Sequence, residues 1–336
     1  MTLPIFVLGE ALMDCMAQPD GQLLPLMGGS PFNLARAAAL RGAAVSYLNP
    51  FSSDLFGQGL AQRLQQDGVH LLGGTTQLPT SLAVVQLTQG QASYGFYREG
   101  IADRDYSLEG IVALLQQQTP GILHTGSLLL IPPEHGKVVA ILKTARELGW
   151  TVSVDINLRP KVAGHLPSYI QAVHQVIALA DWLKASDEDL ETLGFEGVAN
   201  GESARLVREL RQSRVVSGSD LSAVAGSSSN TLSRVALTFG GQGAYLDIDG
   251  QSHSLPVPHI TVADTVGAGD TFWGNTLADW ALQPHDDTAS ARASIAQTLA
   301  YAMKAAAINC TRQGCQPPDR AEVENFKLGG LSTPPK

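Results

Sequence analysis

The stretch D-T-V-G-A-G-D at residues 264–270 places small residues between two carboxylates, directly before a helical pattern. Glycine permits backbone angles that aim successive N–H groups into one concavity, and the following helix adds its positive dipole end. Gly267, Ala268 and Gly269 therefore predict a cradle for an anionic group such as phosphate. Because a carboxylate at Asp270 would repel that phosphate, its position favours a general base that meets a hydroxyl and a phosphoryl group. A capped helix start after a tight turn is the simpler alternative.

A second candidate helix start is G-G-S-P-F-N-L-A at residues 28–35. Its glycines and proline suit the entry of a helix, and alone they predict no more than that. The sequence contains no G-x-x-x-x-G-K-[ST], which excludes a P-loop nucleotide site. No G-x-G-x-x-G follows the first apolar run, which excludes the usual dinucleotide-binding turn.

Together the two stretches resemble the signatures of the ribokinase-like (PfkB) carbohydrate kinases, and among these the sequence is most similar to bacterial fructokinases. The first matches the family's D-T-x-G-A-G-D and the second its G-G-x-x-x-N-x-A. The resemblance implies that Asp270 is the catalytic base and that Gly267, Ala268 and Gly269 neutralise the transferred phosphoryl group. It also implies sugar contacts from Asp14, Gly28, Gly29 and Asn33.

Two more stretches resemble fructokinase elements that face the sugar, namely F-Y-R-E-G-I-A-D-R at residues 96–104 and D-I-N-L-R-P at residues 155–160. Ligands of open α/β sheets collect at the carboxyl ends of strands, which suits polar residues that follow an apolar strand. A solvated loop arginine is the alternative for Arg159. The resemblance implies sugar contacts from Arg98, Asp103, Asn157 and Arg159.

The resemblance also places ATP along the second half of the chain. The family's Asn-x-x-Glu, which helps to organise Mg²⁺ and phosphate, corresponds to Ser186 and Asp189 here, and Glu188 is the acid if the register shifts by one. A capped helix start is the alternative for S-D-E-D. The resemblance implies Mg²⁺ at the nucleotide phosphates, with Asp189 and Asp264 as metal-site residues and K⁺ near Asp264. The implied nucleotide contacts are Lys184, Ser186, Thr238, Gly240, Gly241, Gly243 and Asn309.

The elements that must position these residues alternate between short apolar runs and helical patterns, which is the rhythm of a mainly parallel sheet covered by helices. Residues 10–26 and 81–98 break this rhythm, and the second segment alternates about a turn signal, as in a hairpin. The two predict a small antiparallel flap. The serine-rich residues 213–234 predict a surface loop, and the proline-rich stretches near the C-terminus predict a frayed tail.

The resemblance makes this an α/β fold, a ribokinase-like three-layer α/β/α sandwich with a mainly parallel central sheet and a small β-sheet lid. We expect a single kinase domain over residues 1–330, a lid from about residues 10–27 and 80–106, and a C-terminal tail over residues 331–336. Paired lids are frequent in such kinases, so we also expect a homodimer through the lid.

The composition of the chain argues against some classes of binding partner. With 336 residues, 44% hydrophobic and 16% charged, the chain is long enough for one large core. A formal charge of -9 and the lack of a basic run argue against nucleic acid. The N-terminus has no leader pattern and no apolar run is long enough for a membrane helix, so we expect a cytoplasmic protein without a membrane partner. Three cysteines without C-x-x-C spacing suggest neither a disulfide framework nor a zinc site.

The expected reaction is ATP-dependent phosphorylation of a sugar primary hydroxyl, most simply fructose to fructose 6-phosphate. The first alternative is a 2-keto-3-deoxygluconate kinase or another ribokinase-like sugar kinase; Arg98, Arg104 and Arg159 could contact the carboxylated substrate of the former. A different class of protein, a catalytically silent sugar- or nucleotide-binding protein, is the second.

Overall fold

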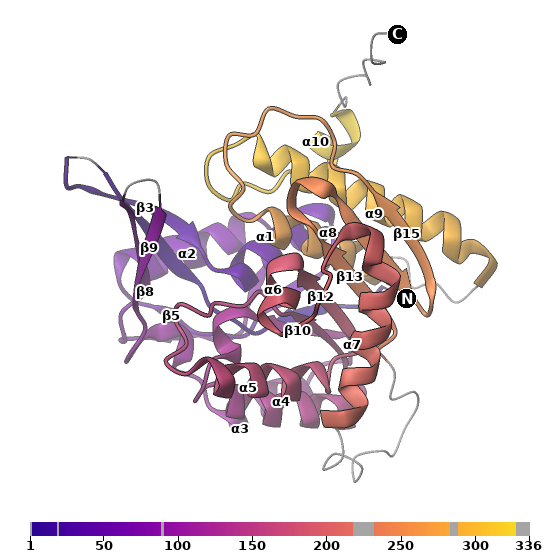
Figure 1. Ribbon diagram of the computed structural model, residues 1–336. Coiled ribbons are helices and arrows are strands. Elements are labelled where there is room, and N and C mark those ends of the chain that lie inside the picture. Colours follow the sequence, from indigo (N-terminus) through magenta and orange to yellow (C-terminus); the bar gives the residue numbers. More distant parts are fainter. Residues whose placement is uncertain (1, 19, 89–90, 218–231, 283–287, 327–336) are drawn as a thin grey trace.

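The computed structural model describes residues 2–18, 20–88, 91–217, 232–282 and 288–326. A nine-stranded sheet forms its centre (Figure 1). Neighbouring strands from β6 through β13 are all parallel, and β14 and β15 extend the β13 edge in antiparallel fashion. The strands, in spatial order, are β15 (Gln251–Leu255), β14 (Ala244–Ile248), β13 (Arg234–Thr238), β12 (Trp182–Ser186), β11 (Thr151–Asp155), β10 (Ile122–Gly126), β1 (Ile5–Val7), β4 (Val45–Tyr47) and β6 (His70–Leu71).

Helices cover both faces of this sheet, which confirms the three-layer α/β/α sandwich. Strand β1 shows why both faces must be covered: Ile5 and Val7 belong to one buried cluster, and Phe6 between them belongs to the other. Parallel strands that are buried on both sides read as continuous apolar runs. One face carries α3 (Leu108–Gln116), α4 (His135–Glu147), α5 (Leu166–Ile177) and α7 (Ser203–Ser217), and the other carries α1 (Ser30–Arg41), α2 (Leu55–Gln66), α8 (Ala268–Leu282) and α9 (Thr288–Cys310).

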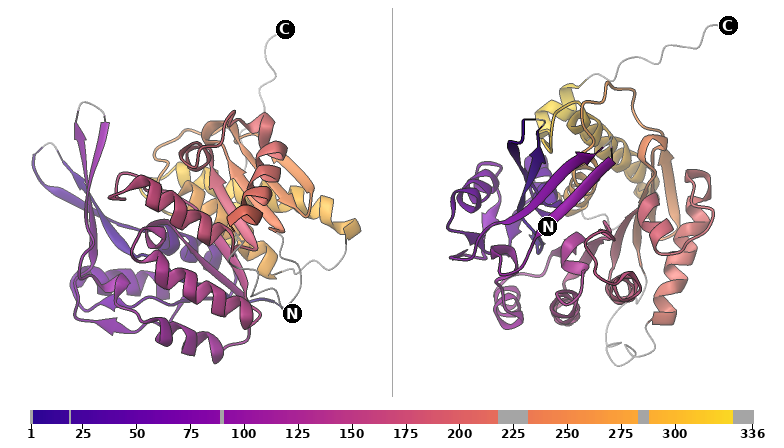
Figure 2. Two further views of the ribbon diagram at one scale, coloured as in Figure 1. Left: turned by 60° about the horizontal axis from the view of Figure 1, so that its bottom comes forward. Right: turned by 60° about the vertical axis from the view of Figure 1, so that its left-hand side comes forward.

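A separate four-stranded sheet projects beyond the helical layers (Figure 2). Its order is β3 (Leu23–Gly28), β2 (Leu12–Ala17), β8 (Ser81–Thr88) and β9 (Gln91–Tyr97), so the two segments that break the βα rhythm do come together. The prediction that this sheet is purely antiparallel is wrong, because β2 and β8 pair in parallel. The reason is topological: β2 and β8 each enter the small sheet from the main body, and each is paired with its own hairpin partner on the outer side. A third, two-stranded sheet joins β5 (Phe51–Ser52) and β7 (Thr75–Thr76).

The remaining elements are short. Helix α6 (Asp187–Thr192) follows β12, and α10 (Arg320–Asn325) follows α9, with single 3-10 turns over Ala102–Arg104, Ser127–Leu130, Asn200–Glu202 and Gly240–Gln242. Helix α10 corrects the expected frayed tail, because a capping box between Asp319 and Glu322 starts a helix there. Residues 331–336 lie outside the described residues.

The serine-rich segment is a helix at its beginning, since α7 continues to Ser217. The expected surface loop is therefore wrong for residues 213–217, and residues 218–231 lie outside the described part. Strand β13 begins at Arg234, the last residue of the segment. In the ranges that the structure describes, no helix is both long and apolar enough to cross a membrane.

Candidate active site

The glycine-containing turn before α8 leaves backbone amides exposed to a ligand. Gly267 has a φ of 72°, and a Cβ at this position would lie 2.2 Å from the Sγ of Cys315. The Ala268 N–H donates to the carbonyl of Thr265, so it is engaged within the turn. Among the described residues, the amides of Gly267 and Gly269 have no acceptor, as is usual for N–H groups at a helix start. The anion cradle therefore rests mainly on these two glycine amides.

Asp270 lies in the first turn of α8 and is only 7% exposed. Both of its carboxylate oxygens accept hydrogen bonds from α1: Ser30 Oγ donates to Oδ1 at 2.7 Å, and Asn33 Nδ2 donates to Oδ2 at 2.9 Å. Burial raises the pKa of Asp270 above its usual value, and the bonds from Asn33 and Ser30 and the charge of Lys184 oppose the rise. A carboxylate with these partners can act as a base near neutral pH.

Close packing of α1 against α8 explains how residues so distant in sequence meet. A Cβ at Gly274 would lie 2.7 Å from the carbonyl of Leu34, so glycine lets the two helices approach. Ser30 and Asn33 are three positions apart and therefore share one face of α1. Gly29, with a φ of 106°, turns the chain into this helix, and a Cβ there would lie 2.5 Å from the carbonyl of Glu10. Gly29 therefore has a structural role in placing Asn33.

Asp14 on β2 and Gly28 on β3 are diagonal neighbours on paired strands, near the junction of the small sheet and α1. A Cβ at Gly28 would lie 2.0 Å from Asp14 Oδ2, so the glycine makes room for the carboxylate. Burial raises the pKa of Asp14 to about 6, with Arg159 opposing the rise and Asp270 adding to it. These mutual effects place Asp14 in the same group of charges as Asp270 and Arg159.

Glu10 was not expected from sequence, and it interacts with Arg159 of this group. It lies between β1 and β2, is 1% exposed, and accepts the Ser30 N–H at Oε1 over 3.3 Å. Burial raises the pKa of Glu10 to about 7, and the positive charges of Arg98 and Arg159 oppose the rise. No partner for Oε2 is found among the described side chains. The available signal was a single charged residue at the carboxyl end of an apolar strand.

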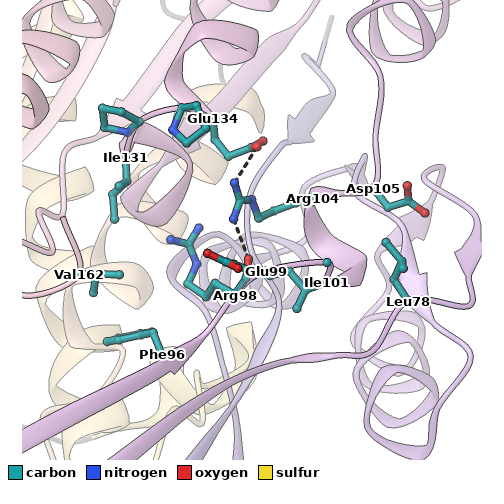
Figure 3. Close-up of a pocket in the computed structure, with 13 residues that line it drawn as sticks. Leu78, Phe96, Arg98, Glu99, Ile101, Arg104, Asp105, Ile131, Glu134 and Val162 are labelled. Carbon is teal, nitrogen blue, oxygen red and sulfur yellow. Dashed lines mark hydrogen bonds and ion pairs between the residues drawn. The ribbon is translucent and has the colours of Figure 1, made fainter. Parts of the chain in front are cut away.

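Arg98 and Asp103 flank Glu10 on the side of the small sheet. Burial raises the pKa of Asp103 to about 7, with Arg98 opposing the rise, and neither Asp103 oxygen has a hydrogen-bond partner in the described structure. Arg98 donates to the carbonyl of Leu128 at 3.2 Å. Arg98 also lines a cavity of about 610 Å³ together with Phe96, Ile131 and Val162. Figure 3 shows Arg104 on the wall of this cavity, donating to Glu134 at 2.9 Å and to the Arg98 carbonyl.

The loop after β11 holds Asn157 and Arg159 in a compact arrangement. Asn157 has a φ of 38°, and its Oδ1 accepts a hydrogen bond from Arg159 Nη1 at 2.6 Å. The Arg159 amide donates to the hydroxyl of Tyr169 on α5. Arg159 is thus fixed by its own loop while its charge acts on Glu10 and Asp14. This disfavours the alternative of a solvated loop arginine.

Lys184 lies directly under the glycine turn. Its Nζ is 2.9 Å from both oxygens of Asp155 on the neighbouring strand β11, and a Cβ at Gly269 would lie 3.2 Å from it. A buried positive charge at this place suits an anion above the turn.

Ser186 and Asp189 form a capping box at the start of α6. Asp189 Oδ2 accepts from the Ser186 amide at 2.8 Å, and Oδ1 accepts from the Leu158 amide at 2.7 Å. The alternative of a capped helix start is therefore observed. Through the Leu158 amide, Asp189 also anchors the loop that carries Arg159. Exposed Glu188 makes no such contact across the loop. Metal binding by Asp189 stays a prediction.

Asn309 and Asp264 tie the glycine turn to the segment after α9. Asn309 Nδ2 donates to the Val266 carbonyl at 2.8 Å, and Asp264 Oδ2 accepts from the Gly314 amide at 2.9 Å. Asp264 Oδ1 accepts from the Val266 amide at 3.0 Å. Both side chains thus stabilise the conformation of the glycine turn through hydrogen bonds between the turn and the end of α9 with the segment that follows it. Within the described ranges, no three His, Cys, Asp or Glu residues are grouped so that they could hold a metal ion.

The remaining predicted residues lie at the same edge of the sheet, beyond Lys184. Thr238 ends β13, and the turn that follows has positive φ angles of 47° at Gly240 and 117° at Gly243. A Cβ at Gly240 or Gly241 would meet no atom within 4 Å, so these positions border open space. The structure places them near the other strand ends but not in contact with Asp270.

Similarity to known proteins extends over nearly the whole chain. The model of the pfkB family of carbohydrate kinases matches residues 4–322. A fructokinase from Rhizobium leguminosarum bv. trifolii is 29% identical over 82% of this chain and 78% of its own length, and one from Vibrio alginolyticus is 28% identical over 90% and 94%. The crystal structure of fructokinase with bound ATP from Xylella fastidiosa aligns with a TM-score of 0.77 at 28% identity, covering 96% of this chain and 98% of that one. Given this coverage, the chain belongs to the pfkB family of carbohydrate kinases.

Proposed function

We propose that this carbohydrate kinase transfers the γ-phosphoryl group of ATP to a primary hydroxyl of fructose, with fructose 6-phosphate as the product. The observation that carries the proposal is Asp270, a buried carboxylate held by two donors beside the amides of Gly267 and Gly269, for which the described part of the chain offers no acceptor. The relatives named as fructokinases support the choice of sugar, and the ATP in the structure from Xylella fastidiosa supports the nucleotide.

In the proposed reaction, Asp270 accepts the proton of the sugar hydroxyl as the hydroxyl oxygen attacks the γ-phosphorus. The O–P bond to the sugar forms, the bond between the γ-phosphorus and the ADP oxygen breaks, and ADP leaves. The amides of Gly267 and Gly269 donate to the phosphoryl oxygens, and Lys184 below the turn adds positive charge where negative charge grows. Protonated Asp270 then releases its proton to solvent.

Mg²⁺ would neutralise part of the charge on the ATP phosphates. Because both Asp189 oxygens bind backbone amides, we propose that the ion is held chiefly by the phosphates and water. The nucleotide contacts proposed for this chain are Lys184, Ser186, Thr238, Gly240, Gly241, Gly243 and Asn309, with K⁺ near Asp264.

The charges around Arg98 favour a neutral sugar over a carboxylated one. Arg98 acts on Glu10 and Asp103, two buried carboxyl groups. Arg104 is paired with Glu134, and Arg159 donates to Asn157. A substrate carboxylate would meet two acidic neighbours, together with arginines whose charges already act on carboxyl groups. The choice of a neutral sugar rests on these charges, because the Nε of Arg98 has no hydrogen-bond partner among the described residues. Glu10 and Asp103, which have unpartnered oxygens, suit the hydroxyls of a neutral sugar instead.

We also propose that the small sheet closes over the sugar and pairs with a second copy of the chain. Leu23 and Tyr97, on its two edge strands, are 50% and 65% exposed, which supports an apolar contact there. Such closure would exclude water from the reacting phosphoryl group.

The test is ADP release with Mg-ATP across fructose, tagatose, ribose, glucose, fructose 1-phosphate and 2-keto-3-deoxygluconate. We expect the highest kcat/KM with fructose, and the position of the phosphate in the product is read by NMR. A higher kcat/KM with 2-keto-3-deoxygluconate would contradict the choice of a neutral sugar, and product phosphate on an oxygen other than O6 would contradict the assigned hydroxyl.

A further inference from the structure

Ser30 makes the shortest contact to the proposed base. It is 5% exposed, and its Oγ lies 2.7 Å from Asp270 Oδ1. A buried hydroxyl needs a partner, and this one donates to a carboxylate, which makes the bond stronger than one between neutral groups. No role in the reaction follows for Ser30 from the two matched signatures, which name the neighbouring glycines and Asn33.

The backbone of Ser30 is held rigidly. Its N–H donates to Glu10 Oε1, Gly29 before it has a left-handed backbone conformation, and Pro31 after it restricts the first helical turn. Glu10 is itself buried in the connection between β1 and β2. The hydroxyl of Ser30 thus stands on a backbone that is fixed by a buried side chain and by the start of α1.

The bond also constrains the chemistry of Asp270. Two donors, Ser30 to Oδ1 and Asn33 to Oδ2, fix the plane of the carboxylate. Each carboxylate oxygen has about two acceptor sites, so an oxygen that binds Ser30 can still receive a proton from a sugar hydroxyl. Both bonds favour the ionised form, which burial disfavours.

We propose that Ser30 is a positioning residue for the reaction: its hydroxyl orients Asp270 and keeps it ionised, ready to accept the proton of the sugar hydroxyl. This inference rests on the proposed role of Asp270 as the base. Glu10 contributes indirectly, because it accepts the Ser30 amide and so fixes the backbone that carries the Ser30 hydroxyl.

Other charges facing Asp270 must be kept constant in any test. Lys184 on β12 and Arg159 after β11 lower its pKa. Asp14 on β2, Asp155 on β11 and Cys315 after α9 are further titratable groups that interact with it. Single substitutions of Ser30 leave all five in place, so a shift in the pH profile can be assigned to the lost hydroxyl.

The test measures kcat and KM against pH for Ser30→Ala, Ser30→Cys and Ser30→Thr. For Ser30→Ala we expect the acidic limb of the kcat/KM profile to move up by about one pH unit and kcat to fall about ten-fold, with KM for ATP unchanged. Ser30→Thr retains the hydroxyl, so its acidic limb and its kcat should stay close to those of the wild type. Ser30→Cys, with a weaker donor, should lie between them, and it also serves if Ser30→Ala fails to fold.

The matched control is Thr276→Val, which removes a buried hydroxyl from the same helix as Asp270; within the described residues, this hydroxyl bonds to the Phe272 carbonyl and to no other group. It should leave the pH profile unchanged. In an Asp270→Asn background, Ser30→Ala should cause no further loss, because Ser30 acts through Asp270.

The outcomes separate the two claims. If Asp270→Asn keeps near-normal turnover, the proposed base is wrong. If Asp270→Asn is nearly inactive but the Ser30→Ala profile keeps its acidic limb and only the Tm falls, Ser30 is merely structural and the inference is overturned.

Discussion

The ammonium group of Lys184 lies 2.9 Å from each carboxylate oxygen of Asp155, and both side chains are buried beneath the glycine turn. The two residues are register partners: Asp155 is the last residue of β11, and Lys184 lies in the middle of β12. Burial raises the pKa of Asp155, and Lys184 opposes the rise. Asp155 therefore fixes the ammonium group of Lys184 directly below the place where we propose that the phosphoryl group binds.

Lys184→Met should lower both stability and turnover. It leaves Asp155 buried without its partner, which typically costs about 3–5 kcal/mol in the free energy of unfolding. The double variant Lys184→Met/Asp155→Leu should regain much of the stability, because two apolar groups replace the pair, but it should remain poor in turnover. Denaturant unfolding and kcat measured side by side test this, and a double variant that recovers kcat would show that the charge of Lys184 has no role in the reaction.

Gly267→Ala should abolish most of the turnover. The position needs a left-handed backbone, and the added Cβ would lie 2.2 Å from Cys315 Sγ, so the turn must shift and its amides move away from the phosphate. Gly136→Ala is the matched control: it lies in α4, where a Cβ meets no atom within 4 Å. That change should stabilise the protein by about 0.5–1 kcal/mol and leave kcat unchanged. Equal kcat in the two variants would contradict the role of the turn.

The family signatures predicted several residues that the structure brings near one another. Asp270 and Asn33 meet because the starts of α8 and α1 pack together, and Asp14 on β2 lies close enough for its charge to interact with that of Asp270. Their roles in the reaction stay predictions. Ser30 and Glu10 were not predicted. Ser30 contacts Asp270, 240 positions away, and Glu10 contacts Ser30, 20 positions away, and no local sequence pattern indicates either contact.

Other differences have local physical causes. S-D-E-D fits a capping box as well as a metal site, and only the position of Leu158 shows which amides Asp189 binds. Strand β15 lies at the edge of the described central sheet, next to β14, and is half-exposed, so its polar Q-S-H-S-L sequence does not show the apolar pattern of a buried strand. Serine is tolerated in helices, so α7 could continue into the serine-rich segment.

Glu10→Gln should change how stability depends on pH. The folded protein raises the pKa of Glu10 from 4.5 to about 7, so folding favours the protonated form. The associated stability is fully present below the unfolded pKa near 4.5 and is lost as the pH rises through about 7. The glutamine variant has no such loss and can still accept the Ser30 amide. Its free energy of unfolding should therefore exceed that of the wild type by a margin that grows to about 3 kcal/mol above pH 7. Parallel curves from chemical denaturation across pH would contradict a buried, protonated Glu10.

Asp189→Ala should weaken sugar binding mainly by loosening the loop after β11, which carries Arg159. It removes the acceptor for the amides of Ser186 and Leu158, so we expect a loss of about 2–3 kcal/mol in stability and a higher KM for the sugar. The Mg²⁺ concentration needed for half-maximal rate should stay unchanged, as it should in the exposed control Glu188→Ala. A selective rise in the Mg²⁺ requirement of Asp189→Ala would instead support metal binding by this residue.

The most direct measurement is the rate of fructose-dependent ADP formation by the wild type and by Asp270→Asn, with ATP binding and Tm measured on both. The structure leads us to expect a folded variant that binds ATP but turns over about 10²- to 10⁴-fold more slowly. A folded Asp270→Asn variant with near-normal turnover would contradict the central claim that the carboxylate held by Ser30 and Asn33 is the base.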